Sequence, residues 1–233
     1  MRKRKIRFID AKKAHLNPLC DAEVYIELPE EAKGGEGVCG KLIHWLYGCR
    51  PAAQAWEGFY AEKFEQEGFK RGEACAVVFF HYERDVTVVC HGDDFTVVAE
   101  EEEIQWITEK MKSWFEIKIR ATLGPDEHDD KEAVILGRIV RWTAAGVEFE
   151  ADPRHRKVLA EHFGFQEDSA ASAYNGDKDR KEDAEDEIEM EKGEATEFRG
   201  MVARMNYLAQ DSPDLQYPSK ELSREMVRPR RGA

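Results

Sequence analysis

The fold is decided by residues 85–99, which read DVTVVCHGDDFTVVA. Asp85–Cys90 and Phe95–Ala99 are rich in Val, Thr and Phe, which favour β-strands, and the segment between them is polar and contains Gly. Two short strands joined in this way predict a β-hairpin. We therefore expect a strand, a tight turn and a strand, with Asp93 and Asp94 adjacent at the tip.

Apolar periodicity predicts further elements on both sides of this hairpin. Ile6–Ile9 is a short, mostly apolar run that ends at Asp10, as expected of a buried strand. Apolar residues recur at helical spacing in Ala52–Glu67, before Gly68, and the same spacing predicts a helix over Glu101–Phe115. Further strands are predicted at Val24–Leu28 and Ala74–Tyr82.

The last hundred residues predict a hairpin, a helix, a charge-rich linker and two more helices. The linker is assigned because it offers almost no large apolar residues to bury. The full order of elements predicts an α+β fold in which helices pack on one face of an antiparallel sheet. The predicted bounds are Val134–Trp142 with Val147–Phe149 for the hairpin, Arg154–Phe163, the linker Gln166–Gly193, Glu194–Leu208 and Pro213–Met226.

Composition bounds the class of protein. The 233 residues are 42% hydrophobic, which is enough for a sizeable core, and the net charge is −13. Asp177–Glu194 holds ten acidic and four basic residues, whereas Met1–Arg7 is basic. Because the negative charge is concentrated in one segment, the net charge of the chain is weak evidence against a polyanionic ligand. Five scattered cysteines without a C-x-x-C pair argue against a disulfide framework or a zinc site. No run approaches the roughly 20 apolar residues of a membrane helix, and we expect an intracellular protein, cytoplasmic or nuclear.

Three carboxylates are the candidate metal ligands. If the strand that ends at Asp10 pairs with the hairpin, its carboxylate converges with those of Asp93 and Asp94 at one sheet end. Oxygen ligands of this kind suit Mg²⁺ or Mn²⁺. Two such ions about 3.5–4 Å apart would activate a primer hydroxyl and stabilise the leaving pyrophosphate. The alternative for a bare Asp-Asp pair is ordinary turn chemistry, since Asp is a common turn residue.

The carboxylates belong to a longer series of short motifs. The matching segments are Phe8–Asn17, Glu23–Glu30, Val38–Leu42, Leu46–Gly48 with Ala52, Ala53 and Trp56, Gly68-Phe69, His91–Asp94, Leu136–Ile139, Phe198–Gly200, Tyr207-Leu208 and Ser212–Leu215. In this order they resemble the Ty1/copia-type reverse transcriptases of LTR retrotransposons, whose catalytic box reads Y-V-D-D where this chain has His91–Asp94. No single segment is decisive, but the collinear set covers nearly the whole chain and is specific.

The resemblance implies a polymerase palm and thumb that perform RNA-directed DNA synthesis with two Mg²⁺ or Mn²⁺ ions. Its expected partners are an RNA template, a DNA primer, deoxynucleoside triphosphates and other parts of the retrotransposon polyprotein, with no membrane. The implied boundaries are a palm-like core at 1–122, a thumb-like hairpin and helix at 123–165, the acidic linker at 166–193 and a helical segment at 194–233.

The resemblance also assigns individual residues. Asp10, Asp93 and Asp94 are the implied catalytic and metal-binding carboxylates. His15, Ala11 and Arg50 are implied in nucleotide binding, with His15 at the position of an aromatic residue that stacks under the sugar. Leu136 and Gly137 are implied in the primer grip.

Several positions depart from the family pattern. Pro51 replaces a Gln that contacts the incoming nucleotide, His15 is smaller and more polar than the usual aromatic residue, and His91-Gly92 replaces Tyr-Val. The chain begins at the first catalytic strand, so we expect the fingers to lie elsewhere and the isolated chain to polymerise weakly. The basic residues of Arg2–Arg7 are a candidate electrostatic substitute.

Two other functions stay open. One is a catalytically silent remnant of such an element that acts, if at all, as a nucleic-acid or protein interaction module. The other is an unrelated α+β interaction module whose acidic segment binds a basic partner. The glycines of Gly35–Gly40 fit a nucleotide-binding pattern only loosely, because no apolar strand leads directly into them, and a flexible loop is the preferred interpretation.

Overall fold

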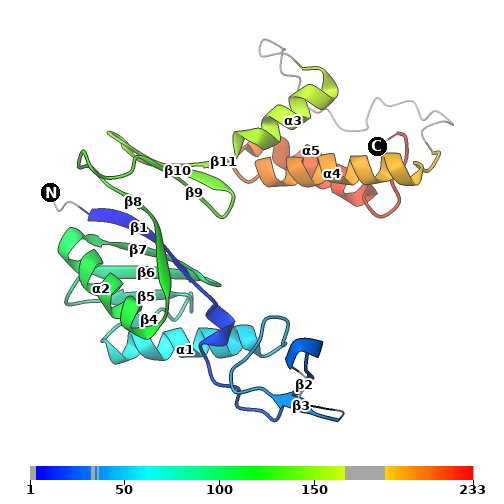
Figure 1. The fold of residues 1–233 in the computed structure, drawn as a ribbon. Coiled ribbons are helices and arrows are strands. Elements are labelled where there is room, and N and C mark those ends of the chain that lie inside the picture. Colours follow the sequence, from blue (N-terminus) through cyan, green and yellow to red (C-terminus); the bar gives the residue numbers. More distant parts are fainter. Residues whose placement is uncertain (1–3, 33–34, 36, 166–186, 233) are drawn as a thin grey trace. The chain divides into compact units, whose positions relative to one another are not determined.

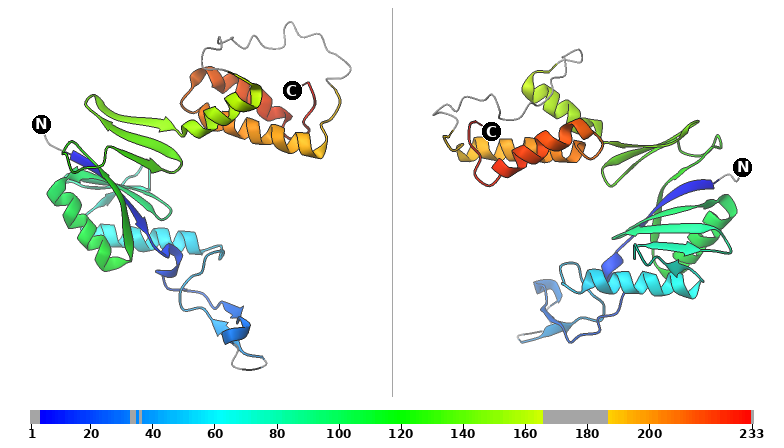
Figure 2. Two further views of the ribbon diagram at one scale, coloured as in Figure 1. Left: turned by 45° about the horizontal axis from the view of Figure 1, so that its top comes forward. Right: turned by 180° about the vertical axis from the view of Figure 1, so that it is seen from behind.

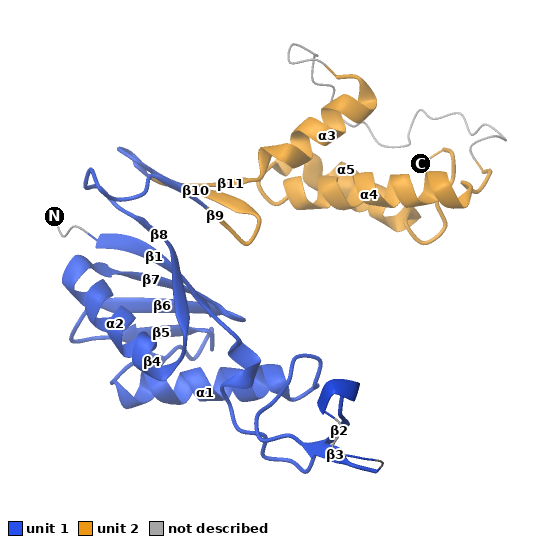
Figure 3. Ribbon diagram, viewed as in Figure 1, with its two compact units in different colours: residues 1–133, 141–146 blue, residues 134–140, 147–233 orange. Residues whose placement is uncertain are grey.

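The computed structural model describes residues 4–32, 35, 37–165 and 187–232 (Figure 1). It divides into two compact units: Met1–Ala133 with Arg141–Gly146, and Val134–Val140 with Val147–Ala233 (Figure 3). The described part of the chain is α+β, with mainly antiparallel sheets and five α-helices. None of these helices is both long enough and apolar enough to cross a membrane.

The first unit is built on a six-stranded sheet with the strand order β4-β5-β6-β7-β1-β8. All of its pairings are antiparallel, and β1 lies between β7 and β8. The hairpin of β6 and β7 therefore lies directly beside the N-terminal strand. The strands are β1 Arg4–Ala11, β4 Lys70–Arg71, β5 Val78–His81, β6 Val86–His91, β7 Asp94–Glu100 and β8 Ile117–Leu123.

Two helices, α1 (Ala52–Gln66) and α2 (Glu101–Trp114), pack on one face of this sheet, as predicted (Figure 2). Side chains alternate along β7, so that Phe95, Val97 and Ala99 face the helices and are buried. Their burial together with the apolar residues of both helices supplies most of the hydrophobic stabilisation of the unit. The buried residues of α1 and α2 in this core are Trp56, Tyr60, Ala61, Phe64, Ile104, Ile107 and Met111.

The predicted central hairpin is confirmed. Cα partners run from Thr87 opposite Val98 to His91 opposite Asp94, and Gly92 and Asp93 form the two-residue turn. Gly92 has φ +61, a left-handed conformation that Gly adopts without the steric cost of a side chain. The predicted strand before Asp10 and the two predicted helices are also confirmed, each within a few residues of the expected bounds.

Strand β8 was not predicted. Its sequence, IKIRATL, places Lys118 and Arg120 between apolar residues, and its side of the sheet is an edge with exposed positions. Pairing with β1 contains an irregularity: Phe8 lies opposite Ala121 and Ile9 lies opposite Ile119. Arg120 is therefore the extra residue of a β-bulge, a feature that re-aims side chains and often lies beside active sites.

The prediction of one strand over Val134–Trp142 was wrong. A tight turn at Leu136-Gly137 divides this run into β9 (Glu132–Ile135) and β10 (Arg138–Thr143), which form a three-stranded sheet with β11 (Gly146–Ala151). Both turn residues have positive φ, +50 and +75, as a type I′ hairpin turn requires. The apolar Leu136 hides this turn from a pattern based on hydrophobicity. A smaller hairpin pairs β2 (Tyr25–Glu27) with β3 (Cys39–Lys41).

The helices of the second unit agree with prediction. Helix α3 (Pro153–Phe163) begins at Asp152, whose side chain accepts a hydrogen bond from the Arg154 N–H. Helix α4 (Lys192–Leu208) begins two residues earlier than expected, with a capping box between Glu191 and Glu194, and α5 is Pro213–Glu225. Residues 166–186 of the predicted linker lie outside the described residues.

Candidate active site

Asp10 and Asp94 lie side by side on the first unit's sheet. They are direct partners in the pairing of β1 with β7. Opposite residues of an antiparallel pair project to the same face. Because Ile9 and Phe95 face the helices, Asp10 and Asp94 project from the other face. Asp93 lies in the adjoining turn and is exposed, so the hairpin brings all three predicted carboxylates to one end of the sheet.

Arg120 bridges two of these carboxylates. Its Nη2 lies 2.5 Å from Asp10 Oδ1 and 3.4 Å from Asp94 Oδ1. The two oxygens therefore lie within about 6 Å of each other, close enough for ligands of a metal pair. Sequence reasoning missed Arg120 because it missed β8, and nothing in the local sequence announces the bulge that places it.

Negative charge at this site is only partly compensated. Burial raises the pKa of the Asp94 carboxyl, Arg120 lowers it, and the charges of Asp93 and Asp10 raise it again, so that the pKa lies above its usual range. The hydrogen bond to Asp10 in turn raises the pKa of Arg120. Three carboxylates, two of which form ion pairs with Arg120, make a donor set that fits a hard divalent ion.

The backbone of the hairpin tip is held by two hydrogen bonds. The Ala11 N–H donates to the Asp93 carbonyl at 2.7 Å, while the Ala11 methyl group is buried. The indole N–H of Trp56, on α1, donates to the Gly92 carbonyl at 2.8 Å. Trp56 lies in the apolar helix predicted over Ala52–Glu67 and is buried, but it also ties α1 to the turn that carries Asp93.

Replacing Trp56 with Phe is expected to weaken Mn²⁺ binding about tenfold. This is the lower end of the loss in metal affinity that follows removal of a group that orients metal ligands. The phenyl ring keeps much of the packing but cannot donate to Gly92. Trp106→Phe is the matched control, because Trp106 packs against the same core without contacting the hairpin tip. Isothermal titration with Mn²⁺ compares the two variants, and equal affinities would remove this role for Trp56.

The residues implied in nucleotide binding lie in separate positions around α1 and β1. His15, in a short 3-10 helix (Ala14–Leu16), stacks on Tyr47 with ring centroids 4.4 Å apart, and no described group hydrogen-bonds its buried Nδ1. Arg50 is exposed directly before α1. Pro51 occupies the N-cap of that helix, so no side-chain donor replaces the Gln of the family pattern.

Leu136 and Gly137, implied in the primer grip, form the β9–β10 turn. Leu136 is 54% exposed, and the Gly137 carbonyl accepts a hydrogen bond from the Tyr207 hydroxyl. The neighbouring Arg138 is buried and pairs with Asp211 and Gln210. These contacts fix the turn to α4 within the second unit.

A second acidic group lies in the loop after β8. Ligand atoms of Asp126, His128 and Asp129 lie within 4.8 Å of one another, the one set of three such atoms found among the described residues at that spacing. Lys5 already occupies this group: its Nζ lies 2.7 Å from Asp129 and 3.0 Å from Asp126. An internal cation therefore satisfies these carboxylates, and Asp10, Asp93 and Asp94 stay the candidate metal ligands.

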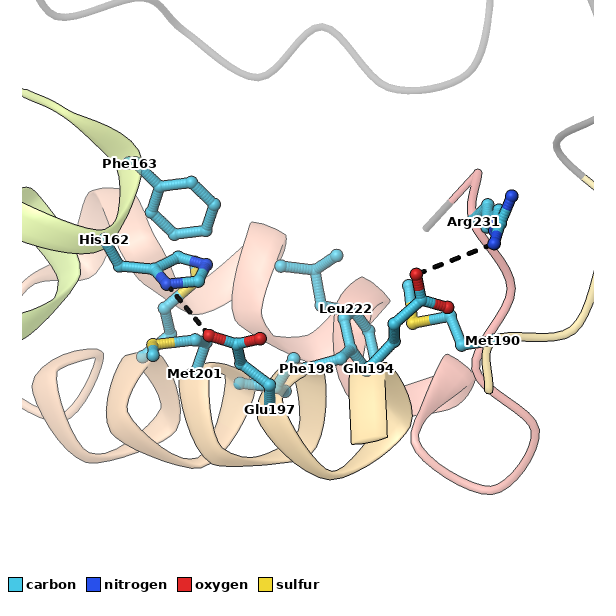
Figure 4. Close-up of a pocket in the computed structure, with 11 residues that line it drawn as sticks. His162, Phe163, Met190, Glu194, Glu197, Phe198, Met201, Leu222 and Arg231 are labelled. Carbon is cyan, nitrogen blue, oxygen red and sulfur yellow. Dashed lines mark ion pairs between the residues drawn. The ribbon is translucent and has the colours of Figure 1, made fainter. Parts of the chain in front are cut away.

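The second unit contains a pocket of about 420 Å³ between α3, α4 and α5 (Figure 4). Its floor is apolar and rich in Met, with Met201, Met205 and Phe198 on α4. Ion pairs of His162 with Glu197 and of Arg231 with Glu194 border it. None of the predicted site residues lines this pocket.

Comparison with known proteins identifies the first unit. Residues 1–126 match the family model described as "Reverse transcriptase (RNA-dependent DNA polymerase)", and the match includes all three aspartates. None of the curated proteins compared with the chain matches it. The matched segment is more than half of the chain and contains the hairpin, the N-terminal strand and both core helices. The chain therefore belongs to the Ty1/copia-type reverse transcriptase family.

Proposed function

We propose that this chain carries the nucleotidyl-transfer site of an RNA-directed DNA polymerase, with Asp10, Asp93 and Asp94 as its metal-binding carboxylates. The observation that carries the proposal is the pairing of Asp10 with Asp94 beside the turn residue Asp93, on the sheet face opposite the helices. In this reading residues 1–122 form a palm, and the β9–β10 hairpin and α3 belong to a thumb-like part within 123–165.

Each residue has a defined task in this reaction. Asp10 and Asp93 would hold two Mg²⁺ or Mn²⁺ ions, with Asp94 as the adjacent, less critical carboxylate. When bound, the ions supply activation of the primer hydroxyl and neutralisation of charge on the leaving pyrophosphate. Trp56 and Ala11 keep the turn in position, and the stacked pair of His15 and Tyr47 offers a surface for the sugar of a deoxynucleoside triphosphate. Template and primer are the implied partners.

The test is incorporation of labelled deoxynucleotide on an RNA template with a DNA primer, in Mg²⁺ and in Mn²⁺. We expect weak, metal-dependent incorporation that is lost in Asp93→Asn. Asp21→Asn, which changes an exposed loop aspartate outside the site, is the control and should retain activity. Incorporation that persists in Asp93→Asn would refute the assignment of the carboxylates.

A catalytically silent descendant is the second candidate function. Pro51 at the N-cap of α1 favours it, since the family's Gln at this position contacts the substrate. This candidate predicts that Mn²⁺ binds to the carboxylates and that the binding is lost in Asp10→Asn. It also predicts that no nucleotide is incorporated under any condition.

A further inference from the structure

We propose that Arg120 is an internal counter-ion that occupies the carboxylate site when no metal is bound and must be displaced before a divalent ion can bind. This inference rests on the proposed function, because it concerns the same carboxylates. Two independent observations carry it: the guanidinium contacts both Asp10 and Asp94, and the bulge in β8 sets Arg120 apart from the regular pairing with β1.

Arg120 is placed to compete with a metal rather than to accompany it. The same Nη2 lies within reach of one oxygen of each carboxylate, which is the region where a bridging ion would take its ligands. A guanidinium and a divalent cation cannot share those oxygens without strong repulsion. Without either cation, Asp10 and Asp94 would face each other as like charges across the β1–β7 pair, which is destabilising.

The exposure of Arg120 makes this displacement feasible. Its side chain is 43% exposed, so it exchanges its protein partners for water at little cost. Lys5 provides the contrast within the same unit, because its side chain is 2% exposed and surrounded by Asp129, Asp126 and Glu101. A cation buried in this way cannot leave without exposing unpaired charges to a poorly solvated site. Lys5 is therefore a permanent partner, whereas Arg120 is a removable one.

The test measures Mn²⁺ binding to the full chain by electron paramagnetic resonance, without nucleic acid or nucleotide. Arg120→Gln is expected to bind Mn²⁺ roughly tenfold more tightly than wild type, because the ion no longer competes with a partly exposed ion pair. Arg120→Lys should lie between the two. Arg84→Gln is the control: Arg84 is 40% exposed and pairs with Glu103 outside the site, and its loss should leave the affinity unchanged.

Thermal unfolding gives a second readout. Without metal, Arg120→Gln is expected to melt at a lower temperature than wild type, since Asp10 and Asp94 lose their counter-ion. Saturating Mn²⁺ should then raise its melting temperature by more than that of wild type. Unchanged or weaker Mn²⁺ affinity in Arg120→Gln would overturn the proposal.

The outcomes separate this inference from the proposed function. If Asp10→Asn abolishes Mn²⁺ binding but Arg120→Gln leaves the affinity as in wild type, the metal site stands and the role of Arg120 falls. If Mn²⁺ binds equally well in wild type and Asp10→Asn, the carboxylates are not the site and both proposals are overturned.

Discussion

Replacing Lys5 with Met is expected to lower the free energy of unfolding of the first unit by about 3–5 kcal/mol, the usual cost of breaking a buried ion pair. The Lys5 ammonium lies 2.7 Å from Asp129, whose side chain is 3% exposed, and 2.9 Å from Glu101 at the start of α2. Removing the cation leaves a buried carboxylate without its partner. Burial alone would raise the pKa of Asp129. The hydrogen bonds from Lys5 and from the Asp126 N–H outweigh this effect and hold the pKa below its usual range, so the charged form depends on these contacts.

Denaturant unfolding followed by Trp fluorescence measures this effect. All five Trp residues belong to the first unit, so the signal reports on that unit. Lys12→Met is the matched control directly after β1, because Lys12 forms an ion pair with Glu116 in which both side chains are about half exposed. The control should be indistinguishable from wild type. A Lys5→Met variant as stable as the control would show that the buried charges contribute nothing to the fold.

Replacing Asp10 with Asn is expected to reduce metal-dependent nucleotide incorporation on the order of 10³-fold, similar to the loss of a group that stabilises transition-state charge. Asn has nearly the same shape as Asp but lacks the charge that a divalent ion and Arg120 require. Because β1 is paired on both sides, the change should leave the fold intact. The effect is measured as the initial rate of primer extension at saturating Mn²⁺.

The control for this experiment is Glu83→Gln, which removes an exposed carboxylate from the loop between β5 and β6. It should retain the wild-type rate. A rate for Asp10→Asn close to that of Glu83→Gln would mean that Asp10 takes no part in catalysis, whatever its position beside Asp94.

Long segments with strong periodicity were predictable from the sequence. The hairpin of β6 and β7 and helices α1 and α2 each bury a continuous apolar face, and a pattern of hydrophobic residues is enough to find them. The candidate carboxylates followed from these elements, because pairing of the strand that ends at Asp10 with the hairpin puts Asp10 beside Asp94, with Asp93 in the adjoining turn.

Features set by tertiary pairing were not predictable. Strand β8 lies at the sheet edge and carries charged residues at alternating positions, so its sequence does not resemble a buried strand. Arg120 was missed with it. The basic N-terminus was interpreted as an electrostatic substitute for the fingers, yet Lys5 and Arg7 are buried. Lys5 forms ion pairs with Glu101 and Asp129, and Arg7 forms one with Glu101. Their internal partners lie about a hundred residues away in the sequence, so the residues around Lys5 and Arg7 do not indicate these ion pairs.

Diffraction from crystals of the chain soaked in Mn²⁺, recorded at the manganese absorption edge, tests the central claim most directly. We predict two anomalous peaks about 3.5–4 Å apart, bound by Asp10, Asp93 and Asp94, with the Arg120 guanidinium no longer between Asp10 and Asp94. Mn²⁺ found only at Asp126, His128 and Asp129, or absent from the neighbourhood of Asp10, would contradict the account.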